Sequence, residues 1–195
     1  MVELPASRRR LLLGAVGLFP GTVAGCLGED SAGSGGDDTP TPDLDHHRGD
    51  GHMPVPDGKI CDSVCGMGAS SPPDWVAQLA HEDGLGAFFC SVGCMVAYNA
   101  DPEWSEGSEA SVIGVWVTDY DSRAIIDGLD ATYVLAQNEV PETGPMGTNP
   151  LPFEDRDVAT AFVEEIDGLS ADEDVVTFDD FDLDIARTYR GNRLP

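Results

Sequence analysis

The sequence contains few basic residues. Its 195 residues include 36 Asp and Glu but 10 Lys and Arg, which gives a formal net charge of -26, and Lys59 is the only lysine. Binding to nucleic acid draws its free energy from basic side chains that release counterions from the phosphates. The charge therefore excludes a direct nucleic-acid partner. An acidic, lysine-poor surface is typical of adaptation to high salt, where the screening length falls to about 3 Å at molar ionic strength.

Long apolar runs are also absent. No stretch reaches the roughly 20 apolar residues that a helix needs to cross a bilayer. Apolar residues still make up 41% of the chain, which is enough for a modest core and excludes disorder throughout. The length favours one domain or two small ones.

The N-terminus has the pattern of an export signal. Ser7–Arg10 precede an apolar run, Leu11–Phe19, and the paired arginines predict twin-arginine export. Thr22–Cys26 follow as small residues ending in a cysteine, the pattern of a lipobox. We therefore expect residues 1–25 to be removed, Cys26 to carry a lipid, and the protein to be anchored at the extracytoplasmic face of the cell membrane. The alternative is a plain signal peptide with an incidental cysteine.

Residues 26–57 are rich in Gly, Asp, Ser, Pro and Thr, which predicts a flexible acidic linker after the lipidated cysteine. His46, His47, His52 and Met53 lie within it. Imidazole and thioether groups both bind copper, so these residues suggest a loose metal-collecting patch. We favour a solvated linker that happens to hold histidines, because a disordered segment offers no preorganised geometry.

Residues 58–181 are predicted to fold as an α+β domain of two small, homologous strand-strand-helix halves. The stretches that indicate strands are Trp75–Leu79, Ala87–Phe89, Val112–Val117, Thr132–Leu135 and Val175–Phe178. The C-terminal tail, 182–195, is expected to be peripheral.

Two segments have helical patterning. The first is Cys90–Tyr98, and the second is Asp155–Ile166 with Gly168 as its expected C-cap. The residues expected on the buried stripe of the second helix are Val158, Phe162, Val163 and Ile166.

Four cysteines remain besides Cys26, and they form two C-x3-C pairs: Cys61 with Cys65, and Cys90 with Cys94. The predicted export makes disulfides one interpretation, with Cys61–Cys94 as a possible cross-pair. A closed four-thiolate zinc site is the second interpretation. A Cu(I) site is the third, since Cu(I) also prefers soft sulfur ligands.

The methionines favour Cu(I). Met67 and Met95 lie close to the cysteines, and Met146 lies in the turn sequence Gly144–Gly147. A thioether needs no deprotonation and suits Cu(I). Core filling is the alternative for Met67 and Met95, whereas Gly and Pro around Met146 predict an exposed loop.

These residues together resemble the NosL family, in the form expected of haloarchaeal members. The segments that carry the resemblance are Val64–Met67, Phe89–Ser91, Val117–Asp119, Tyr133–Val134, Pro145–Gly147 with Phe153, and Phe178–Phe181. The resemblance implies two homologous α+β halves and a lipoprotein that binds Cu(I) and delivers it to nitrous-oxide reductase during maturation. An ABC-type transporter complex is implied as a further partner.

The resemblance also assigns ligand roles to Cys65, Met67 and Met146, with Cys90 as a further candidate. Cys61 and Cys94 depart from the family pattern, because each turns a single cysteine into a pair. Phe88–Cys94 also resembles the YHS/TRASH module, a small Cys-based metal knuckle, which implies zinc or a heavy metal instead.

We expect no enzymatic activity. The C-x3-C spacing differs from the C-x-x-C of thiol oxidoreductases. His81 is the only histidine within 58–181 and is expected at the surface, and Asp179–Asp180 is expected to be a solvated turn. The predicted mechanism is ligand exchange on a metal rather than catalysis.

Overall fold

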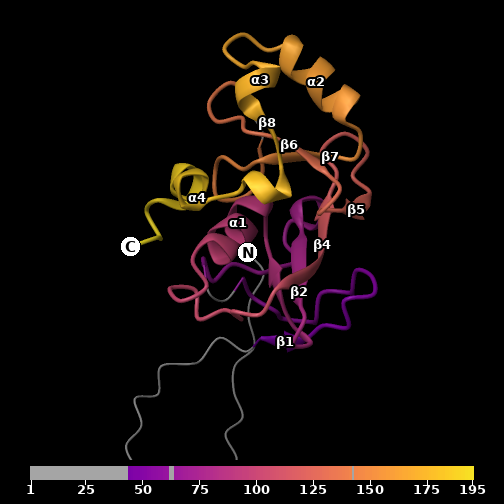
Figure 1. Cartoon of the computed structure of the whole chain (residues 1–195), viewed down its shortest axis with the longest axis vertical. Coiled ribbons are helices and arrows are strands. Elements are labelled where there is room, and N and C mark those ends of the chain that lie inside the picture. Colours follow the sequence, from indigo (N-terminus) through magenta and orange to yellow (C-terminus); the bar gives the residue numbers. More distant parts are fainter. Residues whose placement is uncertain (1–43, 62–63, 142) are drawn as a thin grey trace, which may run out of the picture. The chain divides into compact units, whose positions relative to one another are not determined.

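The computed structural model describes residues 44–61, 64–141 and 143–195. The predicted signal sequence, Cys26 and the first part of the predicted linker lie outside these residues. The described chain is α+β, with one antiparallel sheet of five strands and another of three (Figure 1). None of its helices is long and apolar enough to span a membrane.

The first sheet has the strand order β1-β3-β2-β4-β5. Its strands are β1 (Asp45–His46), β2 (Ala77–His81), β3 (Leu85–Phe89), β4 (Val112–Thr118) and β5 (Ile125–Asp127). The helix α1 (Val92–Ala100) connects β3 to β4, and a 3-10 turn, η1 (Pro73–Trp75), precedes β2. Strand β2 therefore begins two residues later than the sequence predicts.

The second sheet has the order β7-β6-β8. Its strands are β6 (Thr132–Val134), β7 (Leu151–Phe153) and β8 (Val175–Thr177). The helices after β7 are α2 (Arg156–Glu164), α3 (Ala171–Asp174), the 3-10 turn η2 (Phe178–Asp180) and α4 (Leu183–Arg190).

The two halves follow one pattern. Each runs strand, strand, helix, strand, as β2-β3-α1-β4 and β6-β7-α2-β8, and in each the first strand is central. This confirms two strand-strand-helix halves, but the second is built from β6 and β7: the predicted strand Val112–Val117 belongs to the first sheet as β4, and β7 was not among the predicted strands. A short central strand buried on both faces reads as a continuous apolar run, and Thr132, Tyr133 and Val134 of β6 are all buried.

Helix α1 is almost entirely buried, since it packs against β2 and β3 on one side and α4 on another. Helix α2 is amphipathic: Asp155 caps its N-terminus through the N–H of Asp157, and Ala159 and Val163 are its buried residues. The predicted stripe was wrong at Val158, which is 45% exposed. At 100° per residue, Val158 lies about 140° around the helix from Val163. Glu165, not Gly168, is the C-cap.

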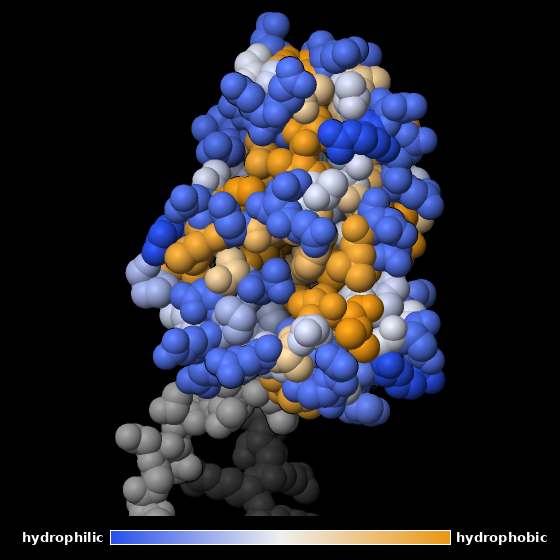
Figure 2. Space-filling model, viewed as in Figure 1, coloured by the Kyte–Doolittle hydropathy of each residue, from blue (hydrophilic) through white to orange (hydrophobic). Residues whose placement is uncertain are grey.

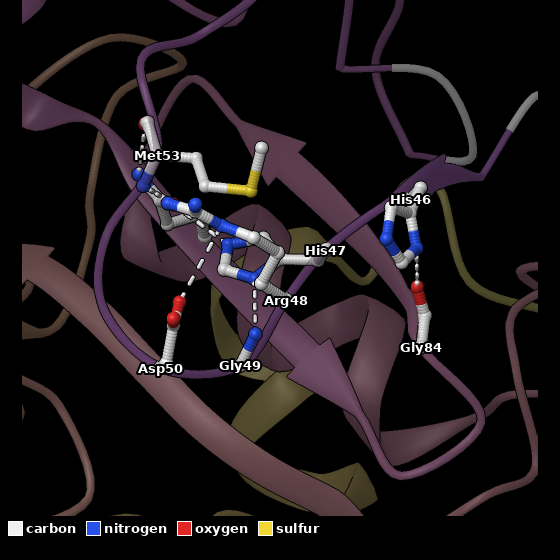
Figure 3. A network of polar contacts seen from close by, with 8 residues as sticks. His46, His47, Arg48, Gly49, Asp50, Met53 and Gly84 are labelled. Atoms are coloured by element: carbon white, nitrogen blue, oxygen red, sulfur yellow. Dashed lines mark hydrogen bonds and ion pairs between the residues drawn. The ribbon is translucent and has the colours of Figure 1, made fainter.

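The predicted linker was wrong for residues 44–57. Strand β1 pairs with β3, and the next residue, His47, is fully buried and stacks on Trp116 with 4.9 Å between ring centroids. Figure 3 shows His46 and His47 pointing in opposite directions, as neighbouring residues of a strand do. The folded domain therefore includes the residues from Leu44 onward, because this segment adds a strand and an aromatic contact to the first sheet.

The expectation of a peripheral tail was also wrong. Asp182 caps α4 through the N–H of Ile185, and the helix packs against α1 (Figure 1). Its buried residues recur every three to four positions, so they share one face of the helix, and this face packs over α1. The buried residues of this segment are Ala186, Tyr189, Arg190 and Leu194.

His81 is buried rather than exposed. One ring nitrogen lies 2.7 Å from the carbonyl oxygen of Ala110 and the other lies 3.1 Å from the hydroxyl of Tyr98. Both nitrogens are therefore engaged within the core. The face of the molecule in Figure 2 is mostly hydrophilic, with apolar residues in small separate patches, as the acidic composition leads one to expect.

Candidate metal centre

Cys61 and Cys65 lie on a tight turn. The carbonyl oxygen of Cys61 accepts the N–H groups of Cys65 and Gly66, at 3.1 and 2.8 Å, and the N–H of Cys61 donates to the carbonyl of Met67 at 2.6 Å. Gly66 has a φ of +71°, a conformation that favours glycine. The turn thus brings the first pair of cysteines to one point.

Cys90 and Cys94 lie where β3 passes into α1. Cys90 directly follows β3, Ser91 is the N-cap residue, and Cys94 is the third residue of the helix. The partial positive charge of a helix N-terminus stabilises a thiolate there. The Ser91 side chain does not cap the helix; its hydroxyl is used elsewhere in the site.

The two pairs meet as one cluster. The four Sγ atoms lie within 4.8 Å of one another, with 3.5 Å between Cys65 and Cys90 and 3.9 Å between Cys90 and Cys94. All four are free thiols. Cys61, Cys90 and Cys94 are fully buried, whereas Cys65 is half-buried. The cluster is therefore open at Cys65, and the disulfide interpretation, with Cys61–Cys94 as its possible pair, does not describe these four cysteines.

The thiols differ in acidity. Hydrogen bonds from the other three thiols, and further the positive charge of Arg190, lower the pKa of Cys94. Hydrogen bonds with the other thiols and burial raise the pKa of Cys61. Hydrogen bonds from Cys61 and Cys90 lower the pKa of Cys65. The centre thus favours thiolates at Cys94 and Cys65, and a thiolate is the form that binds a metal.

Arg190 of α4 completes the inner side of the cluster. It is 1% exposed, and its Nε–H donates to Cys94 Sγ at 3.2 Å. Sequence reasoning missed it, because the tail was expected to be peripheral. The Asp182 cap followed by an apolar period could have revealed the helix, but no local signal places Arg190 beside Cys94.

The methionines have different places. The predicted turn around Met146 is confirmed, but Met146 itself is half-buried rather than exposed, because it packs against the core cluster that contains the cysteines. Its φ of +68° bends the turn there. Met67 is 36% exposed, and Met95 is fully buried in the core. Met95 and Met146 therefore both pack in the core cluster that contains the cysteines, Met95 as a fully buried residue and Met146 at its half-buried margin.

The histidines do not form a second centre. Gly49 N–H donates to Nδ1 of His47 (Figure 3). Nε2–H of His47 donates to the Gln78 side chain, so both of its ring nitrogens are used. His46 Nδ1 pairs with the carbonyl of Gly84. Within residues 44–61, 64–141 and 143–195, the four cysteines form the one group of three or more His, Cys, Asp or Glu placed to hold a metal.

The family model of NosL matches residues 52–185, which contain both halves and all four cysteines. The chain belongs to the NosL family. Among solved structures, the fold is similar to the crystal structure of the copper chaperone NosL from Shewanella denitrificans, at 21% identity and a TM-score of 0.51. The match covers 69% of this chain and 97% of that chain. No curated protein matches.

This NosL domain extends beyond the matched residues at both ends. Strand β1 precedes the match, and α4, which begins at Leu183, continues past its end at residue 185 and carries Arg190. The predicted lipidation at Cys26 stays a prediction. Four cysteine sulfurs, a charged donor and a half-exposed edge give this centre the means to bind a soft metal ion and to let another ligand reach it.

Proposed function

We propose that this protein is a Cu(I)-binding chaperone. The observation that carries the proposal is the convergence of four free thiols, with Sγ atoms within 4.8 Å, in a domain of the NosL family. Thiolate and thioether are the ligands that Cu(I) prefers, and the similar solved structure is described as a copper chaperone.

The proposed mechanism is ligand exchange. Cys65 is the half-exposed thiol, so an incoming sulfur or imidazole of an acceptor can add to the metal from that side. The buried thiols of Cys61, Cys90 and Cys94 then leave in turn. Met146 supplies a neutral thioether that binds Cu(I) without holding it as firmly as a thiolate, and Met67 is the further candidate ligand at the exposed side.

The proposed setting is the extracytoplasmic face of the membrane, with a lipid on Cys26. The twin-arginine pattern and the lipobox support this location, and the resemblance to NosL proteins supports nitrous-oxide reductase as the acceptor and an ABC-type transporter complex as a partner. No catalytic step is required, because the metal changes ligands without any covalent chemistry on a substrate.

Zinc is the second candidate, as in the YHS/TRASH interpretation. A tetrahedral site with zinc–sulfur bonds of about 2.3 Å has sulfur–sulfur edges of about 3.8 Å. The separations of 3.5 and 3.9 Å in this structure bracket that value. A permanently bound zinc would make the centre structural rather than a carrier.

An anaerobic competition titration of the reduced full chain in molar salt distinguishes a Cu(I) chaperone from a structural zinc site. Chromophoric chelators set the free Cu(I) and zinc concentrations. One-to-one Cu(I) binding that excess zinc cannot displace supports the chaperone. Tight zinc binding with weak Cu(I) uptake contradicts it.

Two variants test the ligands within the same titration. Met146→Ala is expected to weaken Cu(I) binding with the fold intact, and unchanged affinity removes Met146 from the site. Cys65→Ser is expected to weaken binding as well. If Cys65→Ser instead unfolds the metal-free domain, Cys65 is a structural residue.

A further inference from the structure

Arg190 is a buried cation that connects the cysteine cluster to the start of α1 and to residues 148–149. Its Nη2 donates to Ser91 Oγ at 2.9 Å and to Asn149 Oδ1 at 2.5 Å, while Nη1 donates to the carbonyls of Thr148 and Tyr189 at 3.0 and 2.7 Å. With the Nε–H bond to Cys94 Sγ, all five N–H donors of the guanidinium are used. Such a fixed fork holds its partners in one geometry.

Arg190 fixes Cys94 through its hydrogen bond. A buried guanidinium is costly unless its donors have partners, and none of the ion pairs among the described residues joins Arg190 to a carboxylate. Its Nε–H donates to Cys94 Sγ at 3.2 Å instead. The rigid guanidinium therefore holds Cys94 at the inner side of the cluster.

Asn149 connects the same guanidinium to the Met146 loop. Its Nδ2 donates to the carbonyls of Thr143 and Pro145 at 2.7 and 2.9 Å, so the loop is wrapped around the Asn149 amide. Its Oδ1 accepts Arg190 Nη2 and also the N–H of Gly93, one residue before Cys94. Asn149 is 1% exposed. The position of the Met146 loop is thus tied to the start of α1.

We propose that Arg190 is a positioning residue of the metal centre, which rests on the proposed function of binding Cu(I). It fixes Cys94 as the innermost ligand and, through Asn149, holds the Met146 loop against the same point. Metal therefore enters and leaves past Cys65, because Cys65 is half-exposed whereas Cys94, which Arg190 holds, is buried. Helix α4 is therefore part of the proposed site, because it carries Arg190.

The test uses the reduced full chain and Cu(I) set by a chromophoric chelator. Arg190→Gln is expected to weaken Cu(I) binding about 10- to 100-fold, the range for groups that orient metal ligands, and Arg190→Lys is expected to recover part of the loss. Arg187→Gln is the matched control on the same helix, because Arg187 is half-exposed and pairs with Asp184 at the surface. It is expected to bind Cu(I) as the unsubstituted chain does.

A double-mutant cycle with Met146→Ala distinguishes positioning from general stabilisation. If Arg190 holds the loop, Met146→Ala weakens Cu(I) binding in the unsubstituted chain but has little further effect in Arg190→Gln. Independent, multiplying effects contradict the proposal. If Arg190→Gln does not fold by circular dichroism, Asn149→Ala takes its place in the cycle, since it releases the loop and leaves the Arg190–Cys94 contact.

The outcomes separate the two proposals. An unsubstituted chain without tight Cu(I) binding overturns the proposed function itself. Tight binding by the unsubstituted chain and by Arg190→Gln alike overturns only the role of Arg190.

Discussion

The two halves share one strand order, yet only the first carries the cysteine cluster. Cys90 stands directly before the N-cap residue of α1, and Cys94 is the third residue of that helix. In the second half the corresponding places, before the N-cap of α2 and at its third residue, hold Glu154 and Val158. The topology therefore provides the same strand-to-helix junction twice.

The two strand-to-helix junctions differ in which other elements pack over them. Helix α4 packs against α1, and Arg190 reaches Cys94 from there. In the second half Val158 is 45% exposed. The comparison teaches that the buried cysteine cluster depends on packing by α4 and on residues distant in sequence, and not on the repeated fold alone.

The largest expected effect tests the difference in packing. Phe89→Ala in the first half is expected to lower the free energy of unfolding by about 3–5 kcal/mol, because Phe89 is 2% exposed and contacts Tyr98. Phe162→Ala in α2 is expected to cost about half as much, since Phe162 is only partly buried. Denaturant unfolding in molar salt measures both. Equal losses would show that the two halves are packed alike.

The next prediction compares the third residue of α1, Cys94, with the third residue of α2, Val158. Cys94→Ser is expected to weaken Cu(I) binding by at least about 100-fold, since a direct ligand matters more than an orienting group. Val158→Ser is expected to leave Cu(I) binding unchanged, and to alter stability by less than about 0.5 kcal/mol. Chelator competition gives the affinities. A Cys94→Ser protein that binds as the unsubstituted chain does would remove Cys94 from the site.

Gly93→Ala tests the close packing at the junction of β3 and α1, where Cys90 and Cys94 lie. A Cβ there would lie 2.7 Å from Asn149 Oδ1 and 2.8 Å from Arg190 Nη2. The gain in helix propensity is about 1 kcal/mol, and overpacking costs about 1–3 kcal/mol, so we expect a net loss of stability together with weaker Cu(I) binding. Asp157→Ala, at the same place in α2, is the control and should leave Cu(I) binding unchanged. A more stable Gly93→Ala protein would contradict the packing described.

The smallest effects separate the two N-cap residues. Asp155→Ala removes a capping bond to Asp157 N–H and is expected to lower the free energy of unfolding by about 1 kcal/mol, with no change in Cu(I) affinity. Ser91→Ala removes no capping bond, because the Ser91 hydroxyl accepts from Arg190 instead. It is expected to change Cu(I) affinity more than stability. The reverse pattern would make Ser91 an ordinary cap.

Much of the fold could be predicted because several of its helices and strands are determined by patterns within short stretches of the sequence. The apolar runs predicted β2, β3, β4, β6 and β8, the capped amphipathic segment predicted α2, and the two C-x3-C pairs indicated a sulfur site. The strand-strand-helix repeat followed from their order. The strands β1, β5 and β7 have two or three residues each and were missed, because so short a run carries no periodicity. Boundaries shifted by one or two residues where prolines lie, as at Pro73 before β2.

The remainder depends on contacts between distant residues. Residues 44–57 are polar and rich in Gly and Pro, and their packing rests on His47 meeting Trp116 across the sheet. His81 is polar by type but finds partners in Tyr98 and Ala110. Cys94 and Arg190 are far apart in sequence, and the periodicity of either helix says nothing of the other.

The contact between Cys94 and Arg190 also bears on when the cluster can form. The two residues lie 96 positions apart in the chain. Until α4 has been synthesised and has packed against α1, no guanidinium lies beside Cys94 and α1 lacks the helix that covers it. The four thiols therefore acquire this arrangement at a late stage of folding, after both sheets and α4 have been made.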